Sequence, residues 1–284
     1  MIKKICLLGL SLVYIAPLLI IFTNSFMSGA EIARNFGAES DLFGRQYQQL
    51  QQTSYIRFHL IPWQISLEQY RTLLFLTPQY LDFFINSVRL TVPIVAMHVV
   101  VGSLGAFGFI TWQWRFKEWL FGLFIIVMVL PFQTTLVPNF IMADWLGLLN
   151  THRGIILPLG FSPFAVFIMR QSMRGIPHSI FEAAKLDGAG QWTQFLLIAL
   201  PMAKGGLAAL VILTFADSWA MVEHPMVFLR DVAQSPLSVE LYRIGQENIG
   251  LIFAASVFYM LPMAWLFIYG QEYFEEGVRL SALK

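Results

Sequence analysis

Charged residues are scarce in this chain of 284 residues: Asp, Glu, Lys and Arg make up 12% of it, against 57% hydrophobic residues. Soluble domains carry about 25% charged residues. Together with a mean hydropathy of +0.65, this shortage indicates an integral membrane protein. The net charge is only +1, so the strongly basic surface that nucleic-acid binding requires is absent and we expect no nucleic-acid partner.

Other absences exclude several kinds of functional site. Cys6 is the one cysteine, which excludes an internal disulfide and a cysteine-based metal site. The five histidines show no metal-ligand spacing. A glycine-rich loop ending in Gly-Lys-Ser/Thr, which would hold ATP phosphates, does not occur. We therefore expect no catalytic residue, no metal and no cofactor in this chain, and energy for any transport would come from a partner.

Long apolar runs are abundant. A helix needs about 20 apolar residues to cross a bilayer, and only helices or closed barrels satisfy their backbone in lipid. The alternation typical of barrel strands is absent, so the sequence predicts an all-α polytopic membrane protein with six transmembrane helices. The predicted spans are about 5–23, 84–110, 119–143, 154–170, 196–222 and 250–270.

Glycine and proline mark special positions in these spans. Three glycines recur every three residues in the second span, where small side chains let helices approach closely. They are Gly102, Gly105 and Gly108. Prolines should kink the helices that contain them. These prolines are Pro93, Pro131, Pro138, Pro158, Pro163 and Pro262.

Six spans place both termini on one side of the membrane. Basic residues concentrate on the cytoplasmic side of membrane proteins. With the termini inside, the inner positions hold Lys3, Lys4, Arg115, Lys117, Arg170, Arg174, Lys185, Lys204, Arg279 and Lys284. Every lysine is in this set, so we expect both termini to be cytoplasmic.

The spans suggest three parts. Residues 1–27 form the first transmembrane helix, 28–83 an extracytoplasmic segment, and 84–284 a core domain with five spans. The segment is Gln-rich around 46–52, and Ser66 to Gln69 has the spacing of a capping box that begins a short helix. This segment could contact a substrate-delivery protein or only cover its own helix bundle.

A polar stretch, 177–201, separates two spans. Ser179 and Glu182 have capping-box spacing, and Gly188 suits the positive φ that ends a helix. We therefore predict a helix over about 180–187, with Pro177 just before it. Ile180, Ala183 and Leu186 share one face, and the small Ala183 and Ala184 leave room for another protein. Spacing alone does not separate docking from a helix that lies on its own bundle.

The same stretch resembles the EAA loop of ABC importer permeases, at Glu182-Ala183-Ala184, Gly188, Ile198 and Leu200-Pro201. The resemblance implies the type I importer permease fold, with this loop as a coupling helix that docks on a cytoplasmic ATPase. It implies coupling roles for Ser179, Glu182, Ala183, Ala184, Asp187 and Gly188. ATP and Mg²⁺ would then bind in two partner ATPase subunits.

Further motifs resemble the carbohydrate-uptake branch, in particular the second of two paired sugar permeases of the maltose-system type. They are Asn86-Ser87, Leu130-Pro131, 146–151, 162–165, Arg170-Gln171, Gln271, Tyr273-Phe274 and Gly277. The resemblance implies a heterodimer with a second permease in a bacterial inner membrane, and a sugar-binding protein outside. One departure is Ala220, which stands where the family often has Asn after a tryptophan.

Polar groups in the spans are candidates for a substrate pathway, because they are costly in lipid. Asp217, Ser218 and Trp219 offer an acceptor and a ring that suit a sugar. Gln133 and Asn139 are further candidates, whereas we expect His98 and Arg89 to pair with polar groups across helices. Two alternatives remain: an ABC permease for a non-sugar solute, and an ion-coupled secondary carrier, which would need intramembrane carboxylates and inverted repeats.

Overall fold

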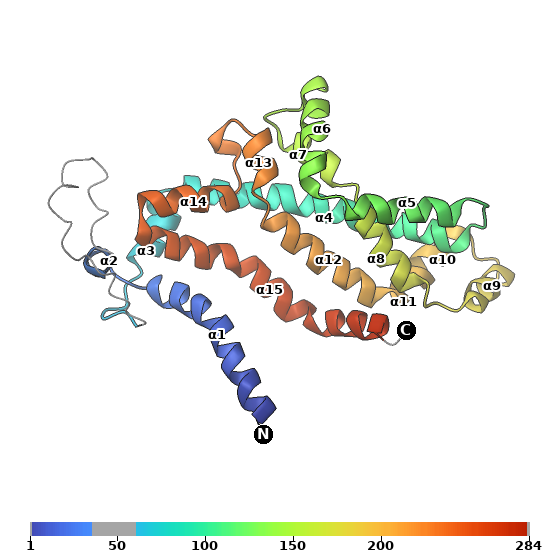
Figure 1. Cartoon of the computed structure of the whole chain (residues 1–284), viewed down its shortest axis with the longest axis horizontal. Coiled ribbons are helices and arrows are strands. Elements are labelled where there is room, and N and C mark those ends of the chain that lie inside the picture. The colour runs from blue at the N-terminus through green and yellow to red at the C-terminus, as the bar shows by residue number, and fades with distance from the viewer. Residues whose placement is uncertain (1, 36–60, 283–284) are drawn as a thin grey trace. The chain divides into compact units, whose positions relative to one another are not determined.

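The computed structural model describes residues 2–35 and 61–282. In these ranges the ordered elements are all helical, as Figure 1 shows, and the all-α prediction is confirmed. The Gln-rich part of the predicted extracytoplasmic segment lies outside the described residues. The chain forms two compact units, which are described in turn: 1–85 with 236–262, and 86–235 with 263–284.

The first unit combines the N-terminal part of the chain with residues 236–262 and has an apolar core. Its helices are α1 (Ile2–Asn24), α2 (Gly29–Asn35), α3 (Glu68–Arg71), a π-helical turn η1 (Thr72–Leu76), the start of α4 (Gln79–Thr111), α14 (Leu237–Glu247) and the start of α15 (Ile249–Ala282). Leu73, Phe83, Leu237 and Ala254 are buried in this core. Apolar residues three and four apart on α14 and α15 thus meet the π-helical turn before α4.

The predicted short helix near residue 68 is present as α3, but its capping box is not formed. Leu67 occupies the N-cap position without a side-chain hydrogen bond. The Ser66 hydroxyl accepts from the Glu68 N–H at 3.2 Å, while Gln69 is buried. Gln69 therefore serves packing inside the unit, where its amide lies against Gly250.

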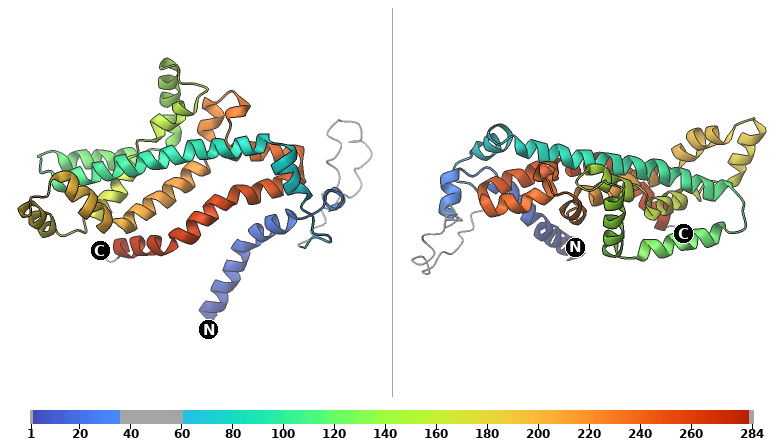
Figure 2. Two further views of the ribbon diagram at one scale, coloured as in Figure 1. Left: turned by 180° about the vertical axis from the view of Figure 1, so that it is seen from behind. Right: turned by 90° about the horizontal axis from the view of Figure 1, so that it is seen from above.

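The second unit holds the remaining helices. They are α5 (Lys117–Val129), α6 (Phe132–Trp145), α7 (His152–Leu159), α8 (Pro163–Met173), α9 (His178–Leu186), α10 (Gln191–Gln194), π-helical η2 (Phe195–Ala199), α11 (Leu200–Met202), α12 (Lys204–Trp219), α13 (Glu223–Phe228) and η3 (Val232–Gln234), with the rest of α4 and α15. Figure 2 shows α9 projecting at the end of this unit where α4 also ends.

Two of the predicted spans are continuous helices and three are bent. Gln79–Thr111 and Ile249–Gln271 are long and apolar enough to cross a membrane. The third span bends by 98° between Lys117–Val129 and Gln133–Trp145, and the fifth by 76° between Gln191–Met202 and Lys204–Trp219. The fourth bends by 41° between α7 and α8. The structure thus supports two to five spans by length and composition, and the number of six stays a prediction.

Proline breaks a helix at some of the predicted places and not at others. Helices α4 and α15 run through Pro93 and Pro262 without interruption. The chain breaks instead at Pro131, which is the N-cap of α6, and before Pro163, which is the first residue of α8. A first-turn proline loses no hydrogen bond, because the N–H there has no partner inside the helix.

Close helix packing in unit 2 uses the glycines of α4. A Cβ on Gly102 would lie 2.8 Å from the Ala165 Cβ, and one on Gly105 would lie 3.1 Å from a Val166 methyl. Both neighbours are on α8, so the prediction of close approach is confirmed at these two positions. A Cβ on Gly108 would meet nothing within 4 Å, and this glycine faces a pocket instead.

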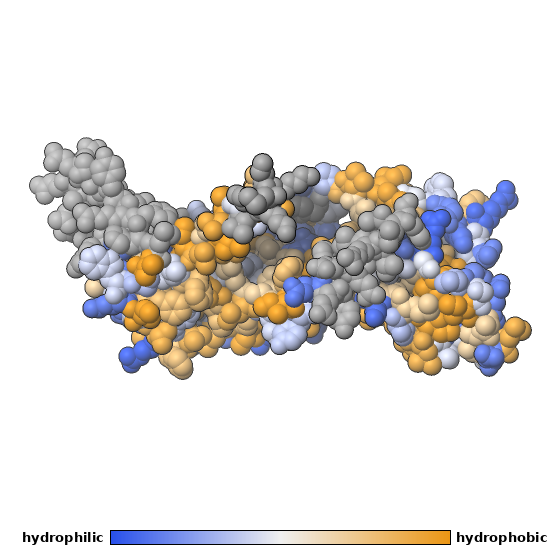
Figure 3. Space-filling view, turned by 90° about the horizontal axis from the view of Figure 1, so that it is seen from below, coloured by the Kyte–Doolittle hydropathy of each residue, from blue (hydrophilic) through white to orange (hydrophobic). Residues whose placement is uncertain are grey.

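Large apolar side chains are exposed along the predicted spans, including Leu123, Ile126, Leu261 and Phe267. Figure 3 shows apolar residues over much of the visible face and hydrophilic ones toward the end that carries α9. Such an extent of exposed apolar surface is unfavourable in water. It fits a protein whose outer surface meets lipid.

Candidate functional site

The polar stretch 177–201 folds around the short helix α9, and its N-terminus differs from the prediction. Pro177 is the N-cap, with φ −60° and ψ 132°. Ser179 therefore lies inside the helix, where its backbone is already helical, and the predicted capping box with Glu182 is wrong. Glu182 instead faces the preceding turn, where its Oε1 lies 3.3 Å from Nδ1 of His178.

The C-terminus of α9 agrees with the prediction. Gly188 has φ +81°. Its N–H donates to the Lys185 carbonyl at 3.0 Å, and the Ala189 N–H donates to the Ala184 carbonyl at 2.9 Å. This pair of bonds is the Schellman motif, which satisfies the last carbonyls of a helix and turns the chain away. The residue at Gly188 thus determines where α9 ends.

One aromatic side chain attaches α9 to the bundle. Phe181 is 4% exposed and belongs to the core cluster of unit 2. Its ring makes an edge contact with Phe107 of α4, with centroids 6.2 Å apart. Phe107 in turn lies 5.3 Å from Phe195 of η2. Sequence reasoning missed Phe181, although it is the only aromatic residue of the helix, and truncating such a buried ring costs about 3–5 kcal/mol.

The opposite face of α9 is open. Ser179, Glu182, Ala183 and Leu186 are exposed, at the spacing of one helix face. Leu186 is 90% exposed, while Ala184 is half-buried and Asp187 and Gly188 are exposed at the helix end. The helix therefore presents a small-residue surface with one large apolar side chain and one carboxylate.

The segment after α9 is held by internal contacts. Gln194 is buried and donates from Nε2 to the Ala189 carbonyl at 2.8 Å. The π-helical turn η2 follows, in which the Leu200 N–H bonds to the Phe195 carbonyl. Pro201 comes next and has no N–H to offer the helix. The wider π turn shifts the hydrogen-bond register before this proline, so the chain stays helical into α11.

A buried arginine joins two helices of the same unit. The Arg170 guanidinium donates to both carboxylate oxygens of Glu118, at 2.7 and 2.9 Å. It also lies 3.7 Å from the ring centre of Phe121 and 5.6 Å from that of Phe109. Two charge-assisted hydrogen bonds from one nitrogen, Nη2, and the ring contacts hold the side chain in place. Arg170 thus joins α8 to α5, whereas the sequence indicated this residue as a charge on the inner side and as part of the Arg170-Gln171 motif.

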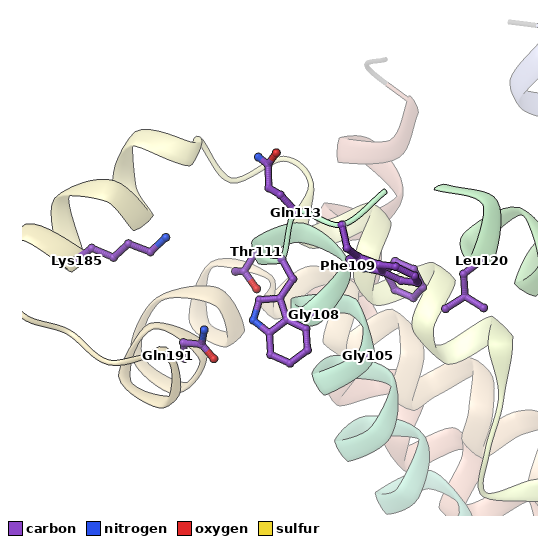
Figure 4. Close-up of a pocket in the computed structure, with 10 residues that line it drawn as sticks. Gly105, Gly108, Phe109, Thr111, Gln113, Leu120, Lys185 and Gln191 are labelled. Carbon is purple, nitrogen blue, oxygen red and sulfur yellow. The ribbon is translucent and has the colours of Figure 1, made fainter. Parts of the chain in front are cut away.

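A pocket of about 770 Å³ lies beside the stretch 177–201. Figure 4 shows Lys185 of α9 and Gln191 of α10 on one side and Leu120 of α5 on the other. Gly105, Gly108, Phe109 and Thr111 of α4 line its floor. A shift of α9 therefore changes the shape of this pocket at the end of α4.

The predicted substrate-pathway residues lie on two helices. Asp217, Ser218 and Trp219 form the last turn of α12, where Asp217 is exposed and Trp219 is 3% exposed. The Trp219 ring is stacked on Phe215, with centroids 5.3 Å apart, so one of its faces is covered. Gln133 is exposed and Asn139 half-buried on α6. Their part in a substrate pathway stays a prediction.

His98 and Arg89 of α4 both have polar partners, and the expected pairing across helices is confirmed for His98 only. His98 Nε2 lies 2.6 Å from the Leu159 carbonyl and therefore donates to it, while Nδ1 lies 3.3 Å from the Thr214 hydroxyl. Arg89 donates to the Asn86 side-chain oxygen at 3.3 Å. His98 therefore connects α4 to α7 and α12, whereas the Arg89 bond lies within α4. In the described part of the chain, no group of three His, Cys, Asp or Glu residues could hold a metal ion.

Comparison with known proteins gives relatives along most of the chain. One is an arabino-oligosaccharide transport permease, AraQ, of Halalkalibacterium halodurans, 31% identical over 72% of this chain and 75% of the relative. The AraQ protein of Bacillus subtilis is 26% identical over 97% of this chain and 92% of its own. A bacterial ABC transporter involved in alginate import has a similar fold, with a TM-score of 0.79 and 23% identity over 96% of this chain and 95% of that chain.

A family model also matches the chain. Residues 98–280 fit the model described as binding-protein-dependent transport system inner membrane component. This range contains α9, the Schellman turn at Gly188 and the π turn before Pro201. The resemblance to ABC importer permeases and their fold is thereby confirmed. The chain belongs to the family of inner membrane components of binding-protein-dependent transport systems.

Proposed function

We propose that this chain is the non-catalytic permease subunit that forms half of the translocation pore for a sugar or oligosaccharide. The relatives named above, together with the melibiose, raffinose and stachyose permease MelC of Bacillus subtilis at 30% identity, support a carbohydrate substrate. A solved structure with a TM-score of 0.56 shows an alginate ABC transporter in complex with a pentasaccharide-bound periplasmic protein. By analogy, an extracytoplasmic binding protein delivers the substrate here.

The proposed assembly has a second permease subunit and two cytoplasmic ATPase subunits, which hold ATP and Mg²⁺. It lies in a bacterial inner membrane with six spans and cytoplasmic termini. Residues 1–27 form the first transmembrane helix, 28–83 an extracytoplasmic segment that faces the binding protein, and 84–284 the core. The open face of α9, anchored by Phe181, is the observation that carries this proposal.

In this mechanism, α9 transmits the state of the ATPase to the pore. Closure of the ATPase dimer moves the coupling helix, and the permease pair changes from inward-facing to outward-facing. The partner biases a two-state equilibrium because it binds one state better. Phe181 connects α9 to α4 and η2 through ring contacts, so displacement of α9 reaches two membrane helices.

A second candidate is transport of a small phosphorylated solute. The sn-glycerol-3-phosphate permease UgpE of Agrobacterium fabrum is 25% identical over 68% of this chain. An anionic substrate would need cationic groups along the pathway, whereas the predicted pathway residue Asp217 is acidic and exposed. A ligand screen of the partner binding protein separates the two candidates. An ion-coupled carrier does not agree with the family assignment.

Glu182 gives the sharpest test. Its pair with His178 joins two exposed side chains, and such pairs contribute little to stability. We expect Glu182→Gln to weaken ATPase association by a factor of ten or more, because loss of one partner of a buried interfacial charge pair costs about 2–5 kcal/mol. His178→Gln is the matched control, since it removes the same internal pair and leaves the carboxylate. Ser179→Ala should have little effect, because Ser179 is not a cap.

The measurement is a detergent pull-down of the ATPase subunits at about 50 mM and about 500 mM salt, since salt screens exposed charges. Membrane insertion should be equal in all variants. If Glu182→Gln retains full binding, Glu182 does not contact the ATPase. If His178→Gln weakens binding as much as Glu182→Gln does, the carboxylate acts inside α9 and not across an interface.

A further inference from the structure

The connection between α4 and α5 carries an unusual set of side chains. Residues 112–119, the aromatic loop, contain three of the eight tryptophans of the chain and one phenylalanine. These four side chains are all exposed, Trp119 by 70%. They are Trp112, Trp114, Phe116 and Trp119. Exposed aromatic rings at this density need an apolar environment or a partner.

The rings enclose a pocket. Trp114, Phe116, Trp119 and Leu120 line a cavity of about 430 Å³. Trp114 and Leu120 also line the larger pocket beside Lys185, in which Figure 4 shows Leu120. Ligand pockets of this size class are lined predominantly by hydrophobic and aromatic side chains. This cavity therefore suits an apolar chain and not a sugar.

The length of α4 places the aromatic loop at a membrane surface. No Asp, Glu, Lys or Arg occurs from Leu90 to Thr111, where α4 ends. At 1.5 Å per residue this run is roughly 33 Å long, close to the hydrocarbon thickness of about 30 Å. Trp112 follows directly, so it falls at the level of the headgroups, where tryptophan is enriched.

Two cations stand at the same level. Arg115 lies over the ring of Phe116, 5.9 Å from its centre, and Lys117 opens α5. The carboxylate of Glu118 is their sequence neighbour, but both of its oxygens bind Arg170. Arg115 and Lys117 are therefore available to an anionic group, and they alternate in sequence with Trp114 and Phe116, which line the apolar pocket. A phosphate attached to an acyl chain combines the two features.

We propose that residues 112–120 form a binding site for one anionic phospholipid of the surrounding bilayer. An acyl chain fills the cavity among Trp114, Phe116, Trp119 and Leu120, and the phosphate meets Arg115 and Lys117. The lipid lies in the leaflet on the side of α9, since Lys185 and Trp114 line the same neighbouring pocket. The site is distinct from the open face of α9.

The first experiment measures lipid preference. The complete transporter is purified in nanodiscs of phosphatidylcholine and phosphatidylglycerol, and retained lipids are counted by native mass spectrometry. Each basic residue near an anionic surface raises affinity by roughly fivefold. We expect Arg115→Gln with Lys117→Gln to lower the preference for phosphatidylglycerol by roughly 25-fold. The matched control, Arg153→Gln with Arg230→Gln, removes two exposed arginines that lie in α7 and after α13 and should retain the preference.

The second experiment identifies what covers the rings. Phosphatidylglycerol with brominated acyl chains should quench tryptophan fluorescence, and Trp114→Phe with Trp119→Phe should remove a large part of the quenched signal. Equal lipid preference in the variant and the control would overturn the proposal. So would a quenched signal that is unchanged by the tryptophan substitutions. If these rings become shielded only when ATPase subunits are added, the aromatic loop binds protein and not lipid.

Discussion

At the scale of single residues, Pro177 and Gly188 set the two ends of α9. Gly188 was expected at positive φ and has φ +81°, because few residues besides glycine end a helix in this way. The capping box was wrong, because its pattern does not say which residue has a non-helical backbone. Pro177 takes that role, and Glu182 lies four residues after His178, within reach of its ring.

Gly188→Val should uncouple transport. A β-branched residue at φ +81° is strained, and the Schellman bonds that end α9 would be lost or displaced. We expect reduced uptake and reduced substrate-stimulated ATPase activity in the purified assembly, with normal membrane insertion. Gly190→Ala is the control, since Gly190 has φ −67° and a Cβ there meets nothing within 4 Å. Normal activity of Gly188→Val would show that the end of α9 does not matter for coupling.

His224 should make the permease sensitive to acid. Burial lowers the pKa of His224 below its ordinary value of 6.5, and the carboxylates of Glu223 and Asp217 offset part of that shift. Because the folded pKa is lowered, the unfolded chain takes up the proton first. The stability contribution is therefore present above about pH 6.5 and is lost as the pH falls through the folded value.

The thermal midpoint of the purified assembly, measured between about pH 7.5 and about pH 5.5, checks this expectation. His224→Gln should flatten the decline at low pH. His178→Gln should not, because His178 is exposed on α9. An equally steep decline in His224→Gln would assign the acid sensitivity to other groups.

At the scale of helices, span positions followed from composition while bends did not. The predicted spans 84–110 and 250–270 lie within α4 and α15. The positions of these two spans could be predicted because an apolar run of about 20 residues indicates a membrane-crossing helix. Whether a helix bends at a proline depends on the residues packed around it. Helix α4 continues through Pro93, whereas the chain bends by 98° at the break that contains Pro131. The sequence shows at which prolines a helix can break. It does not show the packing contacts that decide at which of them the helix does break.

Each of the two π turns lies just before a proline. The Thr77 N–H bonds to the Thr72 carbonyl at 3.0 Å, directly before Pro78. In η2, the Leu200 N–H bonds to the Phe195 carbonyl, directly before Pro201. In both places the wider turn comes before a residue without an N–H. A proline alone does not predict such a turn, because α4 and α15 continue as α-helices through Pro93 and Pro262.

Packing of α4 against α8 gives a matched pair of substitutions. Gly102→Ala would bring a Cβ to 3.0 Å from the Ala165 carbonyl carbon, whereas Gly108→Ala meets nothing within 4 Å. Both substitutions gain the same helix propensity from alanine. The difference between their free energies of unfolding therefore measures the cost of the closer packing at Gly102. We expect Gly102→Ala to be less stable than Gly108→Ala by about 1–3 kcal/mol, as for other overpacked sites. Thermal unfolding in detergent measures the difference. Equal midpoints would mean that α8 moves to accept the added methyl group without loss of stability.

At the scale of the whole molecule, exposed apolar helices require lipid, but they do not say how many cross it. The apolar part of α1 is Gly9–Asn24, which is shorter than the length of about 20 residues that a span requires. Adding α1 to the two continuous and three bent spans gives the six that we propose. The length of an apolar span does not show which of its ends is cytoplasmic. The orientation in the membrane is therefore predicted from the positions of the basic residues.

The orientation prediction is that Lys3 and Lys284 both lie in the cytoplasm. All lysines fall on one side of the six-span arrangement, and cytoplasmic loops carry the excess of basic residues. Lys185 on α9 is among them, so α9 and both termini must share a compartment in the six-span arrangement. Epitope tags at the two ends should be reached by antibody only after cells are permeabilised. A tag between Gln51 and Gln52, in the predicted outer segment, should be reached without permeabilisation. A C-terminal tag that is accessible in intact cells would require an odd number of spans between α9 and the end of the chain, and would remove α15 or the bent α10–α12 pair from the membrane-crossing set.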